Sequence, residues 1–472
     1  MSQDLLSLTK QLARRLSAAS LAPVVEFALR FARTVALSHL LVPTNLGACL
    51  ALSGIVSGCK LATDLGLEKY VVVFGREAPA RAVAAAHQIA IIRGFILAIT
   101  LLLLARPIAW FFGDSVSVET VRWLAIPSAI DGFRNWRVIQ LQLDYKFGPQ
   151  AASVAVAQVG ALIAAIATAH WLRDERVMLI SIIAESAVYV LASHIVAPSA
   201  RSVAIEPRMR WIALHYGAPL MVNGVALWAL NQLDRVIVIN LFGSATLALY
   251  TLATGLAALP IAVLSLVGGS LALPYLERRR RELRPPLHSG PVNVMVGHFV
   301  AAAVYAIGIA VLLNRLVPLL YGSQYNISST FALLLSFFVF FRMIRSGMNA
   351  ILLANNGTLR LTVGNFVGGV GPLAGLAIAM VWHRVESVTL GLVIGDLFSS
   401  IALLLLARHA LPMLEMFVLA GLFASPVVLV AVGLGVTQGA SGLTASASVL
   451  AIGATAVLAS SAAAHRWRLI RL

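Results

Sequence analysis

Charged residues are scarce in this sequence. Of its 472 residues, 35 are Lys or Arg and 19 are Asp or Glu, so charged side chains make up 11% of the chain, against about 25% in soluble domains. So few charges cannot cover a water-exposed surface of this size. A single soluble enzyme domain is therefore excluded. Hydrophobic residues reach 60% and recur in long stretches from end to end, which predicts an all-α polytopic membrane protein.

Cysteine is nearly absent, and familiar catalytic motifs are missing. Cys49 and Cys59 fall on one predicted helix, about 15 Å apart at 1.5 Å per residue, which is too far for a disulfide. No Lys follows a Gly, which excludes a phosphate-binding loop, and no Glu follows a His, which excludes an HExxH zinc site. We therefore expect no metal and no other cofactor. The short external loops hold no cluster of catalytic side chains, so we also expect that the protein is not an enzyme.

Acidic residues are outnumbered, which gives a formal net charge of +16. A basic balance can indicate nucleic acid, but here the basic residues flank or interrupt apolar spans, as membrane orientation requires. We therefore expect membrane lipids, and no nucleic acid, as partners. Residues 1–17 form an amphipathic pattern rather than a cleavable leader and are expected to lie on the cytoplasmic membrane surface.

Apolar windows of about 20 residues predict about 14 transmembrane helices, arranged as two six-helix lobes around a central cavity plus two C-terminal helices. The first lobe should span 18–198, with helices near 18–41, 44–66, 83–104, 118–141, 150–170 and 177–197. A cytoplasmic linker over 199–210 precedes the second lobe over 211–410, which opens with helices near 211–241 and 244–275. Two further helices over 411–464 and a basic cytoplasmic tail over 465–472 complete the prediction.

The distribution of positive charge supports this topology. With a cytoplasmic N-terminus, the predicted inner segments hold 20 Lys or Arg residues and the outer segments hold six. Basic residues concentrate on the cytoplasmic side of membrane proteins, and a missed span would exchange the sides of every later loop. The sequence therefore predicts that both termini are cytoplasmic.

Charged residues inside the predicted spans are the main candidates for function. A charge near the middle of a bilayer costs about 2.5–3.5 kcal/mol on insertion scales, so it should face a cavity or a partner. Basic residues outnumber acidic ones in both lobes: Arg30, Arg33, Lys60, Arg93, Arg134 and Arg137 against Glu26, Asp64 and Asp131, then Arg235, Arg342 and Arg345 against Asp234 and Asp396. Glu185 shares no polar stripe and is not counted. A cavity with surplus cations favours an anion, and guanidinium groups suit phosphate oxygens.

Internal ion pairing is the alternative interpretation of these charges. Spacing along each helix would pair Glu26 with Arg30, Lys60 with Asp64, and Asp131 with Arg134. Such pairs would only hold helices together. The excess of basic residues exceeds what these pairs can neutralise, so the sequence favours a binding role for the set as a whole.

Several segments resemble bacterial oligosaccharide flippases, the polysaccharide-transport branch of the multidrug/oligosaccharidyl-lipid/polysaccharide exporter superfamily. The segments lie over roughly the first 410 residues. They are the two short hairpins Leu41–Gly47 and Leu241–Leu247, the series Asp234, Phe242, Gly243, Leu247, Tyr250, Ala253, Leu259, Pro260, Ser265 and Pro274, the stretch Asp64–Leu67, and the loop from Gln140 to Phe147. Asp144 departs from the pattern, because many relatives are basic there.

The resemblance implies a carrier in the bacterial inner membrane that flips undecaprenyl-pyrophosphate-linked oligosaccharide units by alternating access, for exopolysaccharide or O-antigen export. Its cargo would be a lipid-linked anionic oligosaccharide, and polysaccharide polymerase machinery would be a partner. The eight cationic ligands would be Arg30, Arg33, Lys60, Arg93, Arg134, Arg137, Arg342 and Arg345. Glu26, Asp64, Asp131 and Asp234 would serve in ion pairs or in ion coupling. A flippase of the peptidoglycan precursor and an integral-membrane glycan polymerase or transferase remain as alternatives.

Overall fold

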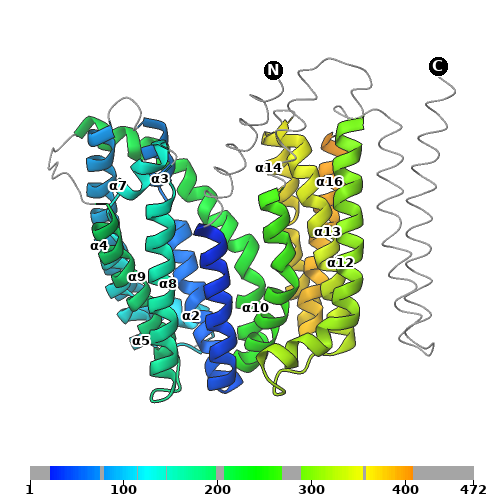
Figure 1. Cartoon of the computed structure of the whole chain (residues 1–472). Coiled ribbons are helices and arrows are strands. Elements are labelled where there is room, and N and C mark those ends of the chain that lie inside the picture. Colours follow the sequence, from blue (N-terminus) through cyan, green and yellow to red (C-terminus); the bar gives the residue numbers. More distant parts are fainter. Residues whose placement is uncertain are drawn as a thin grey trace, which may run out of the picture. The chain divides into compact units, whose positions relative to one another are not determined.

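The structure, a computed structural model, describes residues 22–74, 79–113, 115–144, 146–197, 207–267, 289–354 and 358–407. Every regular element in these ranges is helical (Figure 1). The chain forms two compact units. Unit 1 draws its described residues from Met1–Leu252 and Pro318–Tyr325, and unit 2 from Ala253–Val317 and Asn326–Leu472. The predicted segments 1–17, 411–464 and 465–472 lie outside the described residues, and the predicted lobe boundaries stay predictions.

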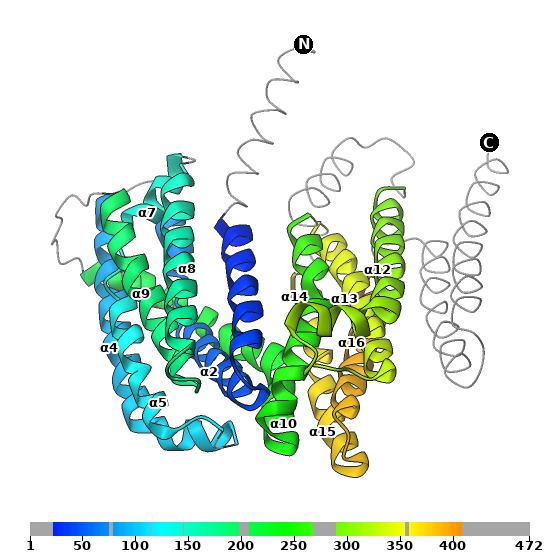
Figure 2. The same cartoon turned by 60° about the horizontal axis from the view of Figure 1, so that its bottom comes forward.

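Unit 1 opens with a helix over residues 22–40. Its other elements are α2 (Pro43–Ala62), α3 (Leu67–Phe74), α4 (Pro79–Phe111), α5 (Val118–Trp123), α6 (Ala125–Asp131), α7 (Arg137–Gln140), the 3-10 turn η1 (Leu141–Asp144), α8 (Gly148–Ala169), α9 (Arg176–Val196) and most of α10 (Pro207–Val267). In this unit α8 packs along α9 (Figure 2). Helix α4 packs on α5 and α6, and α6 also packs on α9.

Unit 2 continues from the end of α10. Its elements are α12 (Ser289–Tyr321) up to Val317, α13 (Ser329–Ala354), α14 (Thr358–Val367), α15 (Val370–Trp382) and α16 (Val385–Ala407). Within this unit α16 packs against α13, α14 and α15. Arg345 on α13 and Asp396 on α16 form an ion pair of 2.5 Å, which ties these two helices together.

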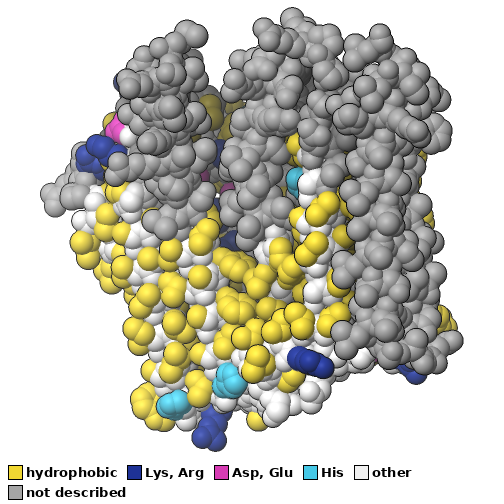
Figure 3. All heavy atoms as spheres, turned by 45° about the vertical axis from the view of Figure 1, so that its right-hand side comes forward, with side chains coloured by type: hydrophobic (Ala, Val, Ile, Leu, Met, Phe, Trp, Pro, Cys, Tyr) yellow, Lys and Arg dark blue, Asp and Glu magenta, His cyan; other side chains and the backbone are white. Residues whose placement is uncertain are grey.

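Nine helical stretches among the described residues are long and apolar enough to cross a membrane. Their outward side chains are largely hydrophobic, as on the face shown in Figure 3, where Lys and Arg side chains appear near the lower end and at the upper left. This pattern matches a surface solvated by lipid. The predicted all-α polytopic membrane fold is therefore confirmed, while the total of about 14 spans extends beyond the described residues.

The fourth predicted span is not a continuous helix, so that prediction was wrong. The structure places α5, α6 and α7 there instead of one helix over 118–141. Pro127 explains the first interruption, since it has no N–H to donate to the carbonyl of Trp123. The second interruption covers residues 132–136, where Asn135 bonds to α9 through its backbone N–H, which donates to Ser193 Oγ at 3.1 Å, and through its amide.

Two histidines satisfy carbonyl groups that this second interruption leaves unpaired. His194 Nε2 lies 3.0 Å from the carbonyl oxygen of Phe133, and His87 Nδ1 lies 3.3 Å from that of Arg134. Inside a membrane, an interrupted helix persists where side chains replace the missing backbone hydrogen bonds. These contacts therefore fix the short segment that carries Arg134.

The second span is interrupted as well, between α2 and α3. Gly66 has a φ of +59°, in the left-handed region, which a glycine adopts without strain. Its N–H donates to Asp64 Oδ1 at 2.8 Å, which closes a tight turn. A similar break divides α10 at Gly243, whose φ is +82°. This break matches the boundary predicted between the helices near 211–241 and 244–275.

Two glycines allow α4 and α6 to approach closely. A Cβ on Gly94 would lie 2.9 Å from the carbonyl oxygen of Ser128, and one on Gly132 would lie 2.9 Å from that of Ala90. The G94A and G132A variants should each lose about 1–3 kcal/mol of stability, because the backbones must separate. Thermal unfolding in detergent would measure this loss. G148A is the matched control, since a Cβ on Gly148 meets nothing within 4 Å; equal melting temperatures in all variants would contradict the prediction.

Candidate functional site

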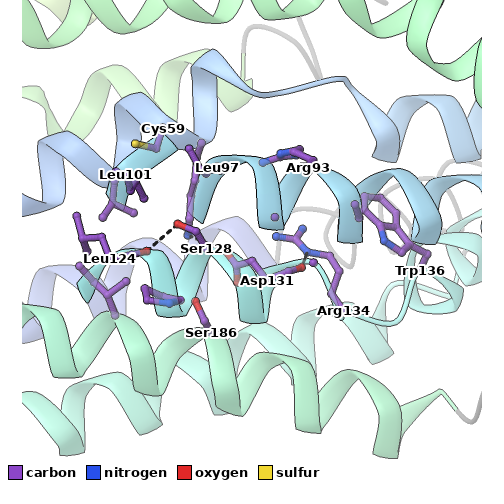
Figure 4. A pocket seen from close by; sticks show the side chains of 17 residues that line it. Cys59, Arg93, Leu97, Leu101, Leu124, Ser128, Asp131, Arg134, Trp136 and Ser186 are labelled. Atoms are coloured by element: carbon purple, nitrogen blue, oxygen red, sulfur yellow. Dashed lines mark hydrogen bonds and ion pairs between the residues drawn. The ribbon is translucent and has the colours of Figure 1, made fainter. Parts of the chain in front are cut away.

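The two interrupted spans bring basic side chains to one cavity on α4. We call this cavity the basic pocket; its lining includes Lys60, Arg93, Ser128, Asp131, Arg134 and Ser186. Figure 4 shows Arg93, Asp131 and Arg134 near one another at one end, with leucine side chains at the other. The volume is about 40 Å³. The pocket is therefore small, and it holds three cationic side chains with one carboxylate.

Arg93 is the least neutralised of these cations. Its Nε donates to Thr63 Oγ1 at 3.1 Å. Thr63 lies in the turn that ends α2. The interruption of the second span therefore positions the Thr63 hydroxyl beside Arg93. Among the described residues, no carboxylate oxygen lies within the 4.0 Å limit of an ion pair with Arg93. A guanidinium in this setting keeps most of its hydrogen-bond donors for another anion.

Lys60 and Arg134 each have a carboxylate at long range. Lys60 Nζ lies 3.8 Å from Asp131 Oδ2, and Arg134 Nη1 lies 3.6 Å from Glu68 Oε1. The Lys60 side chain is 41% exposed and that of Glu68 is 53% exposed. Long and partly solvated ion pairs contribute little stability. Both cations can therefore exchange their present partners for a bound anion at small cost.

These pairs differ from two of the three that helix spacing suggested. Lys60 pairs with Asp131 instead of Asp64, and Arg134 pairs with Glu68 while its Nε donates to the backbone carbonyl of Asp131 at 3.4 Å. The reason is that both helices are interrupted. Asp64 caps the turn at Gly66 and is not on the helical face assumed for it. The third suggested pair, Glu26 with Arg30 at 2.8 Å, is present.

Glu185 is the residue that the sequence reasoning missed. It lies on α9, where it pairs with Arg30 at 3.1 Å and with Arg33 at 3.3 Å. Arg33 also donates to Ser181 at 2.9 Å and is buried. Leaving Glu185 out of the charge count because its own helix has no polar stripe was wrong. Its partners, Arg30 and Arg33, form a polar stripe on the helix over residues 22–40. Its position in the middle of an apolar span was a signal that could have identified it.

A second cavity adjoins the basic pocket and shares Lys60, Asp131, Arg134 and Ser186 with it. We call it the polar pocket; it has a volume of about 320 Å³. Glu26, Arg30, Glu68 and Glu185 contribute the other charged side chains of its lining. Six of the twelve candidate residues line one or both of these cavities: Glu26, Arg30, Lys60, Arg93, Asp131 and Arg134.

The remaining candidates occupy other places. Arg33, Asp64 and Arg137 line neither cavity. Asp234 on α10 is buried and accepts a hydrogen bond from the Tyr250 hydroxyl at 2.7 Å. In unit 2, Arg345 is engaged by Asp396, and the Arg342 guanidinium lies 5.0 Å from the centre of the Phe338 ring. The predicted roles of these residues in binding or coupling stay predictions.

A family model described as a polysaccharide biosynthesis protein matches residues 36–330, which is more than half of the chain. The chain belongs to this family. The matched range includes every residue that lines the basic pocket. No curated protein sequence matches the chain.

Solved structures of transporters have the same fold as this family member. The lipid II flippase MurJ, in an inward closed conformation, has a TM-score of 0.64 at 12% identity over 95% of this chain and 99% of that one. A multidrug resistance MATE family transporter of the MOP superfamily, facing inward, has a TM-score of 0.55 at 16% identity over 82% and 94%. A MOP superfamily transporter from Pyrococcus furiosus has a TM-score of 0.53 at 16% identity over 84% and 95%.

Identities this low show a shared fold rather than a shared cargo. Together with the family match, they show a multi-pass membrane protein of the polysaccharide biosynthesis family that has the fold of MOP superfamily transporters. The resemblance stated from the sequence is thereby confirmed.

Proposed function

We propose that this transporter flips undecaprenyl-diphosphate-linked oligosaccharide units across the bacterial inner membrane for export of a surface polysaccharide. The family description and the transporter fold support this proposal. The observation that carries it is the basic pocket, where Arg93 has no carboxylate within ion-pair distance among the described residues and Lys60 and Arg134 have only distant ones. A diphosphate is the part of such a cargo that these cations recognise.

Arg93, Arg134 and Lys60 are the proposed diphosphate ligands. Their carboxylate contacts are absent or longer than 3.5 Å, so cargo oxygens can replace them without leaving a buried carboxylate unpaired. Arg33 differs, because its guanidinium is buried and already held by Glu185 and Ser181. Taking Glu185 away from Arg33 would leave the Arg33 charge unpaired in a low-dielectric environment, which is costly. Arg33 therefore stabilises the fold, and Arg30 at the edge of the polar pocket contributes less than Arg93.

Alternating access is the proposed transport cycle, in which the pocket opens first to the cytoplasmic side and then to the periplasmic side. The cargo is an anion that leaves a negative-inside cell. Each charge that crosses the field gains about 2.3 kcal/mol per 100 mV, so the membrane potential favours export.

The peptidoglycan precursor is a second candidate cargo. The solved structure named lipid II flippase MurJ covers 95% of this chain in fold comparison. Its named cargo and the lipid-linked oligosaccharide share a polyprenyl diphosphate, so the basic pocket suits both. The sugar portion has to distinguish them, and the transport experiment below therefore compares both cargoes.

The proposed function is tested in proteoliposomes that contain the purified protein. We expect faster flipping of an undecaprenyl-diphosphate oligosaccharide than in protein-free liposomes, and no acceleration for the corresponding uncharged undecaprenol glycoside, because only the diphosphate engages the cations. A lectin added outside reports cargo that has crossed. Equal acceleration of flipping for both lipids would show that the basic pocket does not recognise the diphosphate. Faster flipping of lipid II than of the oligosaccharide lipid would favour the second candidate.

The same preparation tests the rival interpretation, a glycan polymerase or transferase. Such an enzyme would lengthen the sugar chain of the lipid, which mass spectrometry of the recovered cargo would reveal. We expect the cargo to be recovered unchanged in mass.

A further inference from the structure

One intramembrane cation lies outside both pockets, at the contact between α2 and α10. Trp228 Nε1 on α10 donates to the carbonyl oxygen of Gly54 on α2 at 3.1 Å. A Cβ on Gly54 would lie 3.8 Å from Gln232 Oε1, and this oxygen accepts a hydrogen bond of 2.9 Å from Arg235 Nη1. These contacts place the Arg235 guanidinium beside the surface that α2 shares with α10.

Helix α2 separates this cation from the basic pocket. Its contact face with α10 includes Gly54 and Gly58, because a Cβ on Gly58 would lie only 2.8 Å from Trp228 Nε1. The residues of α2 that line the basic pocket are Val56, Cys59 and Lys60. At about 100° per residue, the two sets point roughly 180° apart on the helix. Arg235 therefore does not belong to the group of diphosphate ligands proposed above.

No carboxylate neutralises Arg235. Among the described residues, none has a carboxylate oxygen at ion-pair distance from its guanidinium. Asp234 is its neighbour in sequence, but successive helical residues point about 100° apart, and Asp234 accepts a hydrogen bond from the Tyr250 hydroxyl at 2.7 Å. Gln232, to which Arg235 does donate, is neutral. A charge left uncompensated inside a membrane span is costly, so Arg235 lacks a partner that carries negative charge.

Two donors on one edge of the Arg235 guanidinium are available for that partner. Nε is buried and has no hydrogen-bond partner, and Nη2 donates to none of the described residues. Because Gln232 holds Nη1, the edge formed by Nε and Nη2 is kept in one orientation. Such an edge binds two oxygens of one phosphate group. A water molecule could accept one of these hydrogen bonds, but only an anion would also neutralise the charge.

We propose that Arg235 and Gln232 form a second anion site, which binds the phosphate group of a lipid. The diphosphate of the cargo and the headgroup of a membrane phospholipid share this chemistry. The amide nitrogen of Gln232, which bonds to no described residue, can donate to the same group. The inference goes beyond the proposed function, because the second anion site shares no residue with the basic pocket.

Binding to the purified full-length protein in a phosphate-free detergent tests the second anion site. The R93Q/R134Q variant removes two ligands of the basic pocket, and undecaprenyl diphosphate and phosphatidylglycerol serve as the two probes. We expect R93Q/R134Q to retain measurable binding of at least one probe. Adding R235Q should weaken that binding at least about tenfold, since two hydrogen bonds to a charged group are lost. R106Q in the same background is the matched control and should change nothing, because Arg106 is exposed.

The two probes distinguish the source of the phosphate. A loss confined to undecaprenyl diphosphate supports a site for the cargo, and a loss that includes phosphatidylglycerol supports a site for membrane lipid. Equal affinities with and without R235Q, or no binding to R93Q/R134Q at all, would overturn the inference. If R93Q/R134Q binds both probes as tightly as the wild type and the R235Q single variant does not, the basic pocket and the proposed function fail while the second anion site stands.

Thermal unfolding of the lipid-free protein separates a binding role from a structural one. R235M should keep or raise the melting temperature, because it removes an uncompensated charge from the contact between α2 and α10. A melting temperature below that of the wild type would show that Arg235 stabilises the fold, which would overturn the inference. R235K keeps the charge without the planar fork, so its affinity for the probe should lie between those of the wild type and R235Q.

Discussion

Replacing both Arg93 and Arg134 by glutamine is expected to slow flipping of a diphosphate lipid by at least about 100-fold, since a hydrogen bond to a charged group contributes about 1.5–3 kcal/mol and two such donors are lost. The two side chains lie together at one end of the basic pocket (Figure 4). Cargo flipping in proteoliposomes measures the effect, and size-exclusion chromatography confirms that the variant is folded and inserted.

A control with the same change of charge is available on the same unit. R106Q/R122Q also removes two guanidinium groups, but Arg106 and Arg122 are exposed and line neither pocket. We expect wild-type flipping rates in this control. If both double variants slow flipping equally, the effect comes from net charge, and the basic pocket loses its assigned role.

Arg30 provides a further comparison. It pairs with two carboxylates, Glu26 at 2.8 Å and Glu185 at 3.1 Å, whereas Arg93 pairs with none among the described residues. The prediction from the sequence counted Arg30 and Arg93 equally as ligands of the cargo. Their surroundings separate them, because a neutralised guanidinium attracts an incoming anion less strongly.

Replacing Glu185 by glutamine is expected to lower the free energy of unfolding by about 3 kcal/mol, because it leaves the buried Arg33 without a counter-charge. The Glu185 side chain is 13% exposed and that of Arg33 is 9% exposed. The two residues join α9 to the helix over residues 22–40, so the loss should loosen these two helices. Unfolding followed by circular dichroism in detergent measures the effect.

Two further variants identify its cause. E26Q removes a carboxylate from the same cluster, but the side chain is 36% exposed and Arg30 keeps Glu185, so we expect a loss below about 1 kcal/mol. The double variant R33M/E185M should recover much of the lost stability, because apolar side chains of similar size replace a buried ion pair at little cost. A double variant no more stable than E185Q would show that the packing of Glu185, and not its charge, matters.

The membrane fold could be predicted because its main cause is local. A helix in lipid satisfies its own backbone hydrogen bonds, so apolar segments of sufficient length form spans whatever their neighbours are. For this reason the helices near 150–170 and 177–197 correspond closely to α8 and α9. The exception is the fourth span, where Pro127 and the contacts of Asn135 with α9 interrupt a segment that is apolar enough to cross.

The charge partners could not be predicted in the same way, because they lie on other helices. Glu68 and Glu185 are separated from Arg134 and Arg30 by 66 and 155 residues of sequence, and no helical periodicity relates positions so far apart. Spacing along one helix found only the pair of Glu26 with Arg30. Pairing across helices depends on how the interrupted spans turn their side chains.

The sequence by itself determined that this protein is a helical membrane protein with an excess of intramembrane cations, because hydropathy and charge are properties of each segment alone. Only the tertiary structure decided which cations remain available. It placed Arg93 beside Thr63 without a carboxylate at ion-pair distance among the described residues, and it enclosed Arg33 with Glu185. The physical reason is that the strength of a charge depends on its neighbours in space, and folding brings those neighbours from distant parts of the chain.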